Sequence, residues 1–118
     1  MIKSFSFDTI LAKYYGTEEA IILHGLMLWT ERNISENINY HEGYYWVRGN
    51  ENSFKTTYEH LFTYEKVKRI LRSLEAKGAI LVGNYGYNES DHTKYYAVTE
   101  EAKRIQANKP NGIKEASK

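Results

Sequence analysis

The chain has 118 residues, of which 42% are hydrophobic and 26% are charged. This length and composition predict one globular domain built around a single hydrophobic core. No apolar run approaches the roughly 20 residues of a membrane-spanning helix, and the first residues lack a signal-peptide core, so we expect a cytoplasmic protein without membrane contact. The absence of cysteine excludes disulfides and thiolate zinc sites.

The net charge is only +1, which argues against a strongly basic, non-specific nucleic-acid binder. The charge is unevenly distributed, however. Residues 1–54 carry four Lys/Arg and seven Asp/Glu, whereas residues 55–118 carry twelve and eight, so the net charge changes from −3 to +4. Positive charge therefore concentrates in the second half of the chain.

Two helices are predicted at the start of the chain. The first covers Phe7–Tyr15, with Ser6 or Asp8 available as its cap and Gly16 at its end. The second begins at Thr17 as its cap, with acidic residues at the positive end of the helix dipole, and apolar residues 21–29 mark it as a buried scaffold helix. We expect this helix to fade in the Asn-rich segment 33–39.

A strand and a helix-turn-helix are expected next. Aromatic and branched residues between two glycines predict a strand at Tyr44–Arg48. A short helix follows around Thr56–Leu61, capped by Ser53 or Thr56, with Tyr58, Leu61 and Phe62 facing inward. Thr63 caps the next helix, Tyr64–Lys77, so only a few residues join the two helices.

The helix Tyr64–Lys77 has two unlike faces. Val67, Ile70, Leu71 and Leu74 are spaced to form one apolar stripe, whereas Lys68, Arg69 and Arg72 point largely the other way. Gly78 ends this helix because glycine readily takes the left-handed conformation. Two alternating segments, 79–85 and 93–99, then predict antiparallel strands with one buried face, joined by a polar loop.

A last helix is expected at Thr99–Ala107, with Thr99 as its cap. Residues 108–118 contain Pro, Gly and many charges, so we expect a polar, disordered tail after a domain that covers residues 1–107. The fold class predicted from these elements is α+β: a winged helix-turn-helix, mostly helical, with a small antiparallel β-sheet as the wing.

The order of these segments resembles the N-terminal winged-helix domain of phage and plasmid replication initiators, the replisome organisers. In that family a strand with a Trp precedes the first helix of the helix-turn-helix, and the second helix carries an Arg beside a Leu pair and ends in Leu-Glu-x-x-Gly. A Thr-x-Tyr-Tyr strand closes the wing. Here these places belong to Trp46, Arg69 with Leu71 and Leu74, residues 74–78, and residues 93–96. Residues 18–32 also resemble the family's scaffold helix, and the likeness extends over Phe7–Val98.

The resemblance implies origin recognition in the replication of a phage or mobile element, through double-stranded DNA. In a major groove, outward side chains would contact phosphates and base edges, and Arg69 and Arg72 offer the planar fork that reads guanine. The candidate nucleic-acid contacts are Thr56, Thr57, Tyr64, Lys66, Lys68, Arg69, Arg72 and Lys94. Family wings usually hold several cations, whereas the loop here carries Glu89 and Asp91.

Other functions remain open on the same fold. Transcriptional regulation uses the same pattern, and the near-neutral charge also fits a phage-encoded adaptor or inhibitor that binds a replication or host protein instead of DNA. A single copy with about four phosphate contacts would bind weakly, which suggests a homodimer through residues 21–29 or the last helix.

Catalysis, a metal and a cofactor are not expected. The histidines His24, His41, His60 and His92 lack the spacing of metal ligands on one helix or loop. Ser90, Asp91 and His92 are neighbours in a loop, whereas a catalytic triad is assembled by the fold from separate positions. The glycines near residue 85 suit a hairpin better than a phosphate-binding loop.

Overall fold

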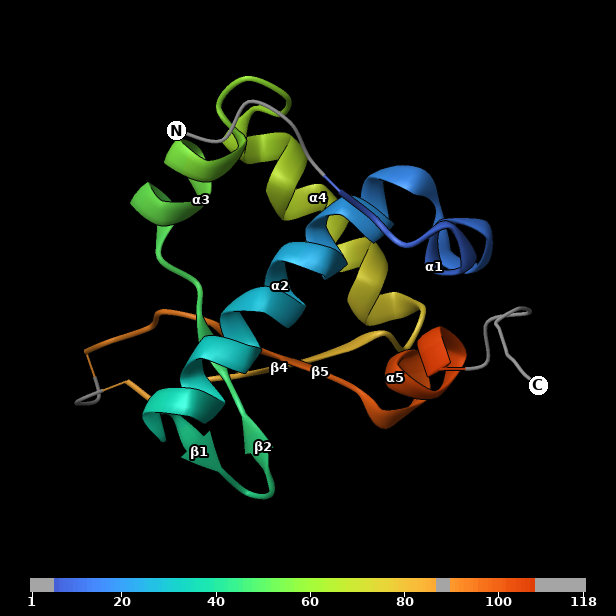
Figure 1. Cartoon of the computed structure of the whole chain (residues 1–118). Helices are drawn as coiled ribbons and strands as arrows, with labels where there is room; N and C mark the ends of the chain where they lie inside the picture. Colours follow the sequence, from blue (N-terminus) through green and yellow to red (C-terminus); the bar gives the residue numbers. More distant parts are fainter. Residues whose placement is uncertain (1–5, 87–89, 108–118) are drawn as a thin grey trace.

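The computed structural model describes residues 6–86 and 90–107. Within these residues the chain forms five helices and five strands (Figure 1), which in chain order are α1 (Thr9–Tyr15), α2 (Thr17–Glu36), β1 (Tyr40–His41), β2 (Tyr44–Tyr45), β3 (Val47–Arg48), α3 (Glu51–Tyr58), α4 (Tyr64–Ala76), β4 (Ile80–Gly83), β5 (Tyr95–Val98) and α5 (Glu100–Ala107).

The long helix α2 lies at the centre, in contact with α1, α4 and the three-stranded sheet (Figure 1). That sheet is antiparallel with the order β3-β5-β4, and β1 and β2 form a separate antiparallel hairpin. α3 contacts α4, and α5 packs against α1. The molecule is thus a compact α+β domain, mostly helical with small antiparallel sheets, which confirms the predicted class at this level.

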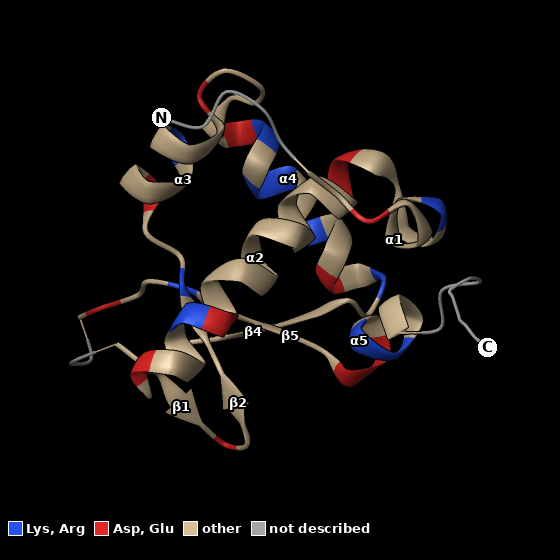
Figure 2. Ribbon diagram, viewed as in Figure 1, with Lys and Arg blue, Asp and Glu red and all other residues tan. Residues whose placement is uncertain are grey.

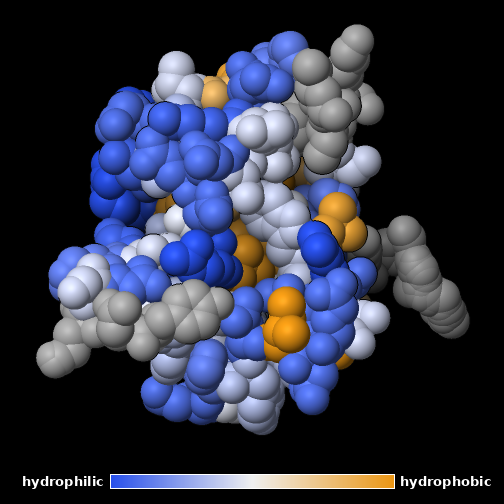
Figure 3. Space-filling model, turned by 90° about the vertical axis from the view of Figure 1, so that its left-hand side faces the viewer, coloured by the Kyte–Doolittle hydropathy of each residue, from blue (hydrophilic) through white to orange (hydrophobic). Residues whose placement is uncertain are grey.

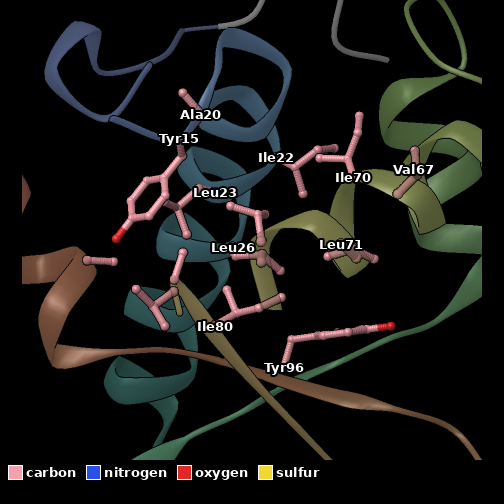
Figure 4. Close-up of a cluster of buried hydrophobic side chains, with 14 of the residues drawn as sticks. Tyr15, Ala20, Ile22, Leu23, Leu26, Val67, Ile70, Leu71, Ile80 and Tyr96 are labelled. Atoms are coloured by element: carbon pink, nitrogen blue, oxygen red, sulfur yellow. The ribbon is translucent and has the colours of Figure 1, made fainter. Parts of the chain in front are cut away.

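The core forms where α2 and α4 meet above the sheet. Val67, Ile70, Leu71 and Leu74 of α4 are at most 3% exposed, so the stripe predicted for this helix is confirmed. Figure 4 shows side chains from α2, including Leu26, pointing toward this stripe. Because each buried side chain of this size stabilises the fold by roughly 1.5–3 kcal/mol, the α2–α4 contact fixes which face of α4 remains outside.

The ends of α4 and the start of α5 are as predicted. The Thr63 side chain accepts a hydrogen bond from the Lys66 backbone N–H at 3.1 Å, which caps α4. Gly78 has φ +79° just after α4 ends. The Thr99 hydroxyl accepts a hydrogen bond from the Ala102 N–H at 3.2 Å and caps α5.

The starts of two other helices differ from the prediction. α2 has Gly16 at its cap position and no capping side chain, so Thr17 is the first helical residue and not the cap. α3 begins at Glu51 instead of Thr56, and its cap is Asn50, whose side chain accepts from the Ser53 N–H at 3.1 Å. The residues that open α3 are polar and exposed, so they show no apolar spacing in the sequence.

The inward face of α3 is also only partly as predicted. Tyr58 is buried at 1% exposure and Phe62 packs against the core, but Leu61 is 45% exposed. Phe54, which the prediction left out, is buried at 2% and lies near the ring of Tyr96. Its burial follows from the earlier start of α3, because Phe54 and Tyr58 are four residues apart on one helix face.

The predicted strand Tyr44–Arg48 is divided between two sheets. β2 pairs with β1, whereas β3 pairs with β5, and Trp46 lies between them. The Trp46 indole N–H donates to the His41 carbonyl at 2.9 Å, and its backbone N–H donates to the Asn39 carbonyl at 2.9 Å. A two-residue strand such as β1 is too short to give an alternating pattern, so the sequence did not predict it.

The sheet buries both of its faces around β5, where one buried face was predicted. Tyr96 and Val98 join the main core, while Trp46, Tyr95 and Ala97 form a second buried cluster on the other side. All four residues of β5 are therefore buried. The hairpin that carries Trp46 covers the second face, which the sequence pattern of β5 alone does not reveal.

The residues that the structure describes include no helix that is long and apolar enough to cross a membrane. The predicted disordered tail, residues 108–118, lies outside the described residues, as does Glu89 in the loop between β4 and β5.

Candidate nucleic-acid interface

A polar groove of about 730 Å³ lies between α3, α4 and the sheet. The side chains of Leu71, Val82 and Tyr96 contribute apolar surface to it. α3 and the segment that enters β5 extend toward the left in Figure 1, and Figure 3 shows that side as mostly hydrophilic with small hydrophobic areas. The polar and charged residues that line the groove are Arg48, Asn50, Glu51, Asn52, Tyr64, Lys68, Arg72, Glu75, His92, Thr93 and Lys94.

The groove brings together half of the predicted contact residues. Tyr64, Lys68 and Arg72 from α4 and Lys94 from the segment before β5 all line it. Thr56, Thr57, Lys66 and Arg69 do not. Thr56 is exposed on α3 and Thr57 is half-buried, and neither is the cap of α3.

The two arginines of α4 are cations without an internal partner among the described residues. Arg69 and Arg72 are exposed, and no described residue holds either guanidinium in a hydrogen bond or an ion pair. The spacing i, i+3 places them on neighbouring positions of one helix surface. Figure 2 shows basic residues along α4, with acidic residues near its two ends. A planar guanidinium without an internal partner is suited to pair with phosphate or a guanine edge.

The two lysines of α4 are, in contrast, partly compensated. The Lys66 ammonium lies 3.1 Å from a carboxylate oxygen of Glu18 on α2, and Lys68 lies 3.2 Å from Glu65 within α4. Exposed ion pairs of this kind are weak, so a polyanion can displace the carboxylates. The arginines nevertheless need no such exchange, which makes them the stronger candidates.

Arg72 and the buried Tyr96 both line the polar groove. Burial raises the pKa of Tyr96 to about 12, while the positive charge of Arg72 acts in the opposite direction. Tyr96 is only 8% exposed. Tyr64 and Glu75, which also line the groove, raise the pKa of Tyr96 further, so Arg72 is the groove residue whose charge opposes them.

The ring of Tyr64 contacts lysines of both α3 and α4. The Lys68 ammonium lies 5.0 Å from the ring centroid, and the Lys55 ammonium of α3 lies 5.7 Å from it. Lys55 also contacts Glu51 at 2.6 Å, and this carboxylate raises the pKa of Lys55. The Tyr64 ring thus makes cation–π contacts with ammonium groups of two separate helices.

Arg48 is a groove residue that the sequence analysis missed. Its Nη2 lies 3.3 Å from the Thr93 hydroxyl and 3.5 Å from the Asp91 carboxylate. The Tyr95 hydroxyl and then Asp91 raise the pKa of this guanidinium. Arg48 sits opposite Tyr95 in the β3–β5 ladder, so it ties the segment before β5 to the sheet and positions Lys94.

Asp91 is therefore used inside the fold. Its other carboxylate oxygen accepts a hydrogen bond from the Thr93 N–H at 3.0 Å. The acidic character of the loop, seen in the sequence, is partly explained by this tie to Arg48 and Thr93. The contact between Arg48 and Asp91 follows from the pairing of β3 with β5 and cannot be read from the sequence, because the two residues are far apart in the chain.

Among the described residues, no group of three or more His, Asp or Glu side chains is arranged to hold a metal ion. Comparison of the chain with protein-family models, curated proteins and solved structures gave no match. The residues and geometry of the polar groove are therefore the features that point to a function.

Proposed function

We propose that this protein is a winged helix-turn-helix that binds double-stranded DNA, without catalysis, by placing α4 in the major groove. The order α2, β3, α3, α4, β4, β5 and the sheet order β3-β5-β4 support this reading. α3 and α4 are joined by residues 59–63 and contact each other, as in a helix-turn-helix. The segment between β4 and β5 takes the place of a wing.

The observation that carries the proposal is the division of α4 into two faces. Its apolar stripe is fully committed to the core, whereas Arg69 and Arg72 are exposed and unpaired within the described chain. With 13 residues, α4 is about 20 Å long, and a major groove about 12 Å wide admits a helix of ordinary diameter. Lys94 lines the polar groove of the protein from the segment before β5, where it would meet the phosphate backbone of the DNA.

The role that we propose for DNA binding is origin recognition during replication of a phage or mobile element. The likeness of residues 7–98 to replisome organisers supports this role. Transcriptional regulation on the same fold is the alternative, since a major-groove helix serves both purposes. A protein-binding adaptor or inhibitor is favoured by one observation, the compensation of Lys66 and Lys68 by Glu18 and Glu65.

The test is binding to random duplex DNA at about 50 and 200 mM salt. Four phosphate contacts predict roughly a hundredfold loss of affinity over this range. Arg69→Ala with Arg72→Ala removes two of them, so the loss should fall to roughly tenfold. Arg32→Ala with Arg104→Ala is the matched control, because these arginines are exposed and do not line the polar groove.

We expect the control variant to keep the steep salt dependence of the wild type. A double variant in α4 that binds like the control contradicts the assignment of α4 as the contact surface. Absence of measurable wild-type binding even at low salt contradicts DNA binding as a whole and favours the protein partner.

A further inference from the structure

The outward face of α2 carries large apolar side chains that nothing in the described chain covers. Leu28 is 52% exposed and Ile34 is 50% exposed. Positions 24, 27, 28, 31 and 34 recur every three or four residues, so they share one side of the helix. Ile38, just past the end of α2, is 43% exposed. Single exposed apolar residues are normal at a protein surface, but several apolar residues gathered on one side of a helix are typical of an interface.

This row forms one wall of an apolar groove of about 260 Å³ between α2 and α5, which His24, Leu28, Glu31 and Ile34 also line. Met27 and Thr30 line it from α2, Val98 from the end of β5, and Lys103 and Gln106 from α5. This groove shares no lining residue with the polar groove of α4. A partner bound here would leave Arg69 and Arg72 accessible.

The charges beside the apolar groove are self-complementary. Glu31 lies on the α2 side and makes no ion pair with any described residue, while Lys103 lies on the α5 side. Lys103 has only a loose contact with Glu100, at 3.6 Å, and the Glu100 side chain is 71% exposed. A two-fold axis would place Glu31 of each copy opposite Lys103 of the other, which creates two equivalent ion pairs.

The same surface thus presents an apolar groove, an exposed apolar wall of that groove and a pair of opposite charges. An isologous interface requires a patch that fits a second copy of itself, and these features allow it. We propose that a second copy of this chain occupies the α2–α5 groove, with the Leu28 and Ile34 wall of each protomer packed against the groove of its partner. This inference stands on the α2–α5 surface alone and does not depend on DNA binding.

The first test is the mass of the protein in solution from about micromolar to about millimolar concentration, by sedimentation equilibrium. The wild type should rise from the mass of one chain to that of two. Ile34→Glu and Leu28→Glu should remain single chains, because each would place an unpaired carboxylate in the interface. Both positions are half exposed, so these variants should fold, and circular dichroism checks this.

Leu81→Glu is the matched control, because Leu81 is 38% exposed on β4 and lines neither groove. It should dimerise like the wild type. A wild type that stays a single chain at every concentration overturns the proposal, and so does an Ile34→Glu variant that dimerises as well as the wild type.

A charge exchange tests the orientation of the two copies. Glu31→Lys alone and Lys103→Glu alone each set like charges against each other at two symmetric places, so each should weaken dimerisation by at least about tenfold. The double variant restores opposite charges and should recover most of the affinity. Failure of the double variant to recover overturns the proposed arrangement. A dimer that does not bind DNA would contradict only the proposed function.

Discussion

α4 and α2 pack against each other, yet their outward faces have opposite chemistry. Outside, α4 carries Arg69 and Arg72, whereas α2 carries Leu28 and Ile34. The inward faces of the two helices are alike, because both place aliphatic side chains in the core and bury them almost completely (Figure 4). The difference shows that burial alone explains the inward half of each helix. For the outward halves we propose two different partners, DNA for α4 and a second copy of the chain for α2.

The largest effect should come from the inward half of α4. Leu74 has no exposed surface, so Leu74→Ala should lower the free energy of unfolding by about 2–5 kcal/mol through lost contacts and a residual cavity. Urea unfolding measures this loss. Arg72→Ala is the comparison on the outward half, and it should stay within about 0.5 kcal/mol of the wild type. Equal losses in the two variants would contradict the division of α4 into a structural and a functional face.

A smaller effect is expected where α2 approaches α3. Gly25 lies within α2, and a Cβ at this position would overlap the Tyr58 hydroxyl. Gly→Ala inside a helix normally gains about 1 kcal/mol, but here we expect Gly25→Ala to lose about 1–3 kcal/mol through this overlap. Thermal unfolding of the variant gives the sign.

Tyr58→Phe supplies the control for this contact, because it removes the oxygen that the new methyl group meets. Gly25→Ala should cost much less in the Tyr58→Phe background, and the double-mutant cycle isolates the coupling. Additive effects of the two changes would show that α2 and α3 do not meet at this point.

The smallest effect is a dependence of stability on alkaline pH. Burial raises the pKa of Tyr58 and of Tyr96 from 10.0 to about 12. The folded chain therefore keeps these protons at a pH where the unfolded chain releases them. This contribution is fully present below pH 10 and is lost as the pH rises toward 12. We expect a loss of roughly 1 kcal/mol per tyrosine by about pH 11, measured by urea unfolding.

Tyr58→Phe should remove about half of this pH dependence. A slope that is the same in the variant would show that Tyr58 ionises in the folded chain as it does in the unfolded chain. Tyr96 is the more informative of the two for the polar groove, because it lines that groove together with Arg72, whose positive charge lowers its pKa.

Local chemistry made much of the fold predictable. Thr63, the stripe of α4 and Gly78 act within one helix and its ends, so their spacing in the sequence predicted their roles. The predicted start of α3 was wrong, because Asn50 caps a first turn of exposed polar residues and such a turn resembles a loop in the sequence. The second face of β5 is buried by Trp46, which lies far from β5 in the sequence, so the pattern of β5 alone could not predict this burial.

The candidate site was predictable where one helix supplies it and not where strands assemble it. Lys68 and Arg72 follow from the outward face of α4, and the groove contains both. Arg48 enters the groove only through the pairing of β3 with β5, and its contacts with Asp91 and Thr93 join positions more than forty residues apart. No periodicity within a single segment encodes such a contact.

The contact between α1 and α5 determines which segment of the chain must be kept together when the domain is fused to another protein. Tyr15 of α1 is buried, and its pKa is raised by burial and by the nearby Glu101 of α5. Ala102, on the same helix as Glu101, has no exposed surface. A fragment that ended at Val98 would lack α5 and would expose the buried surface of α1 at Tyr15 to solvent. In gene fusions or domain exchange, the transferred segment therefore has to include both α1 and α5, from Asp8 to Ala107.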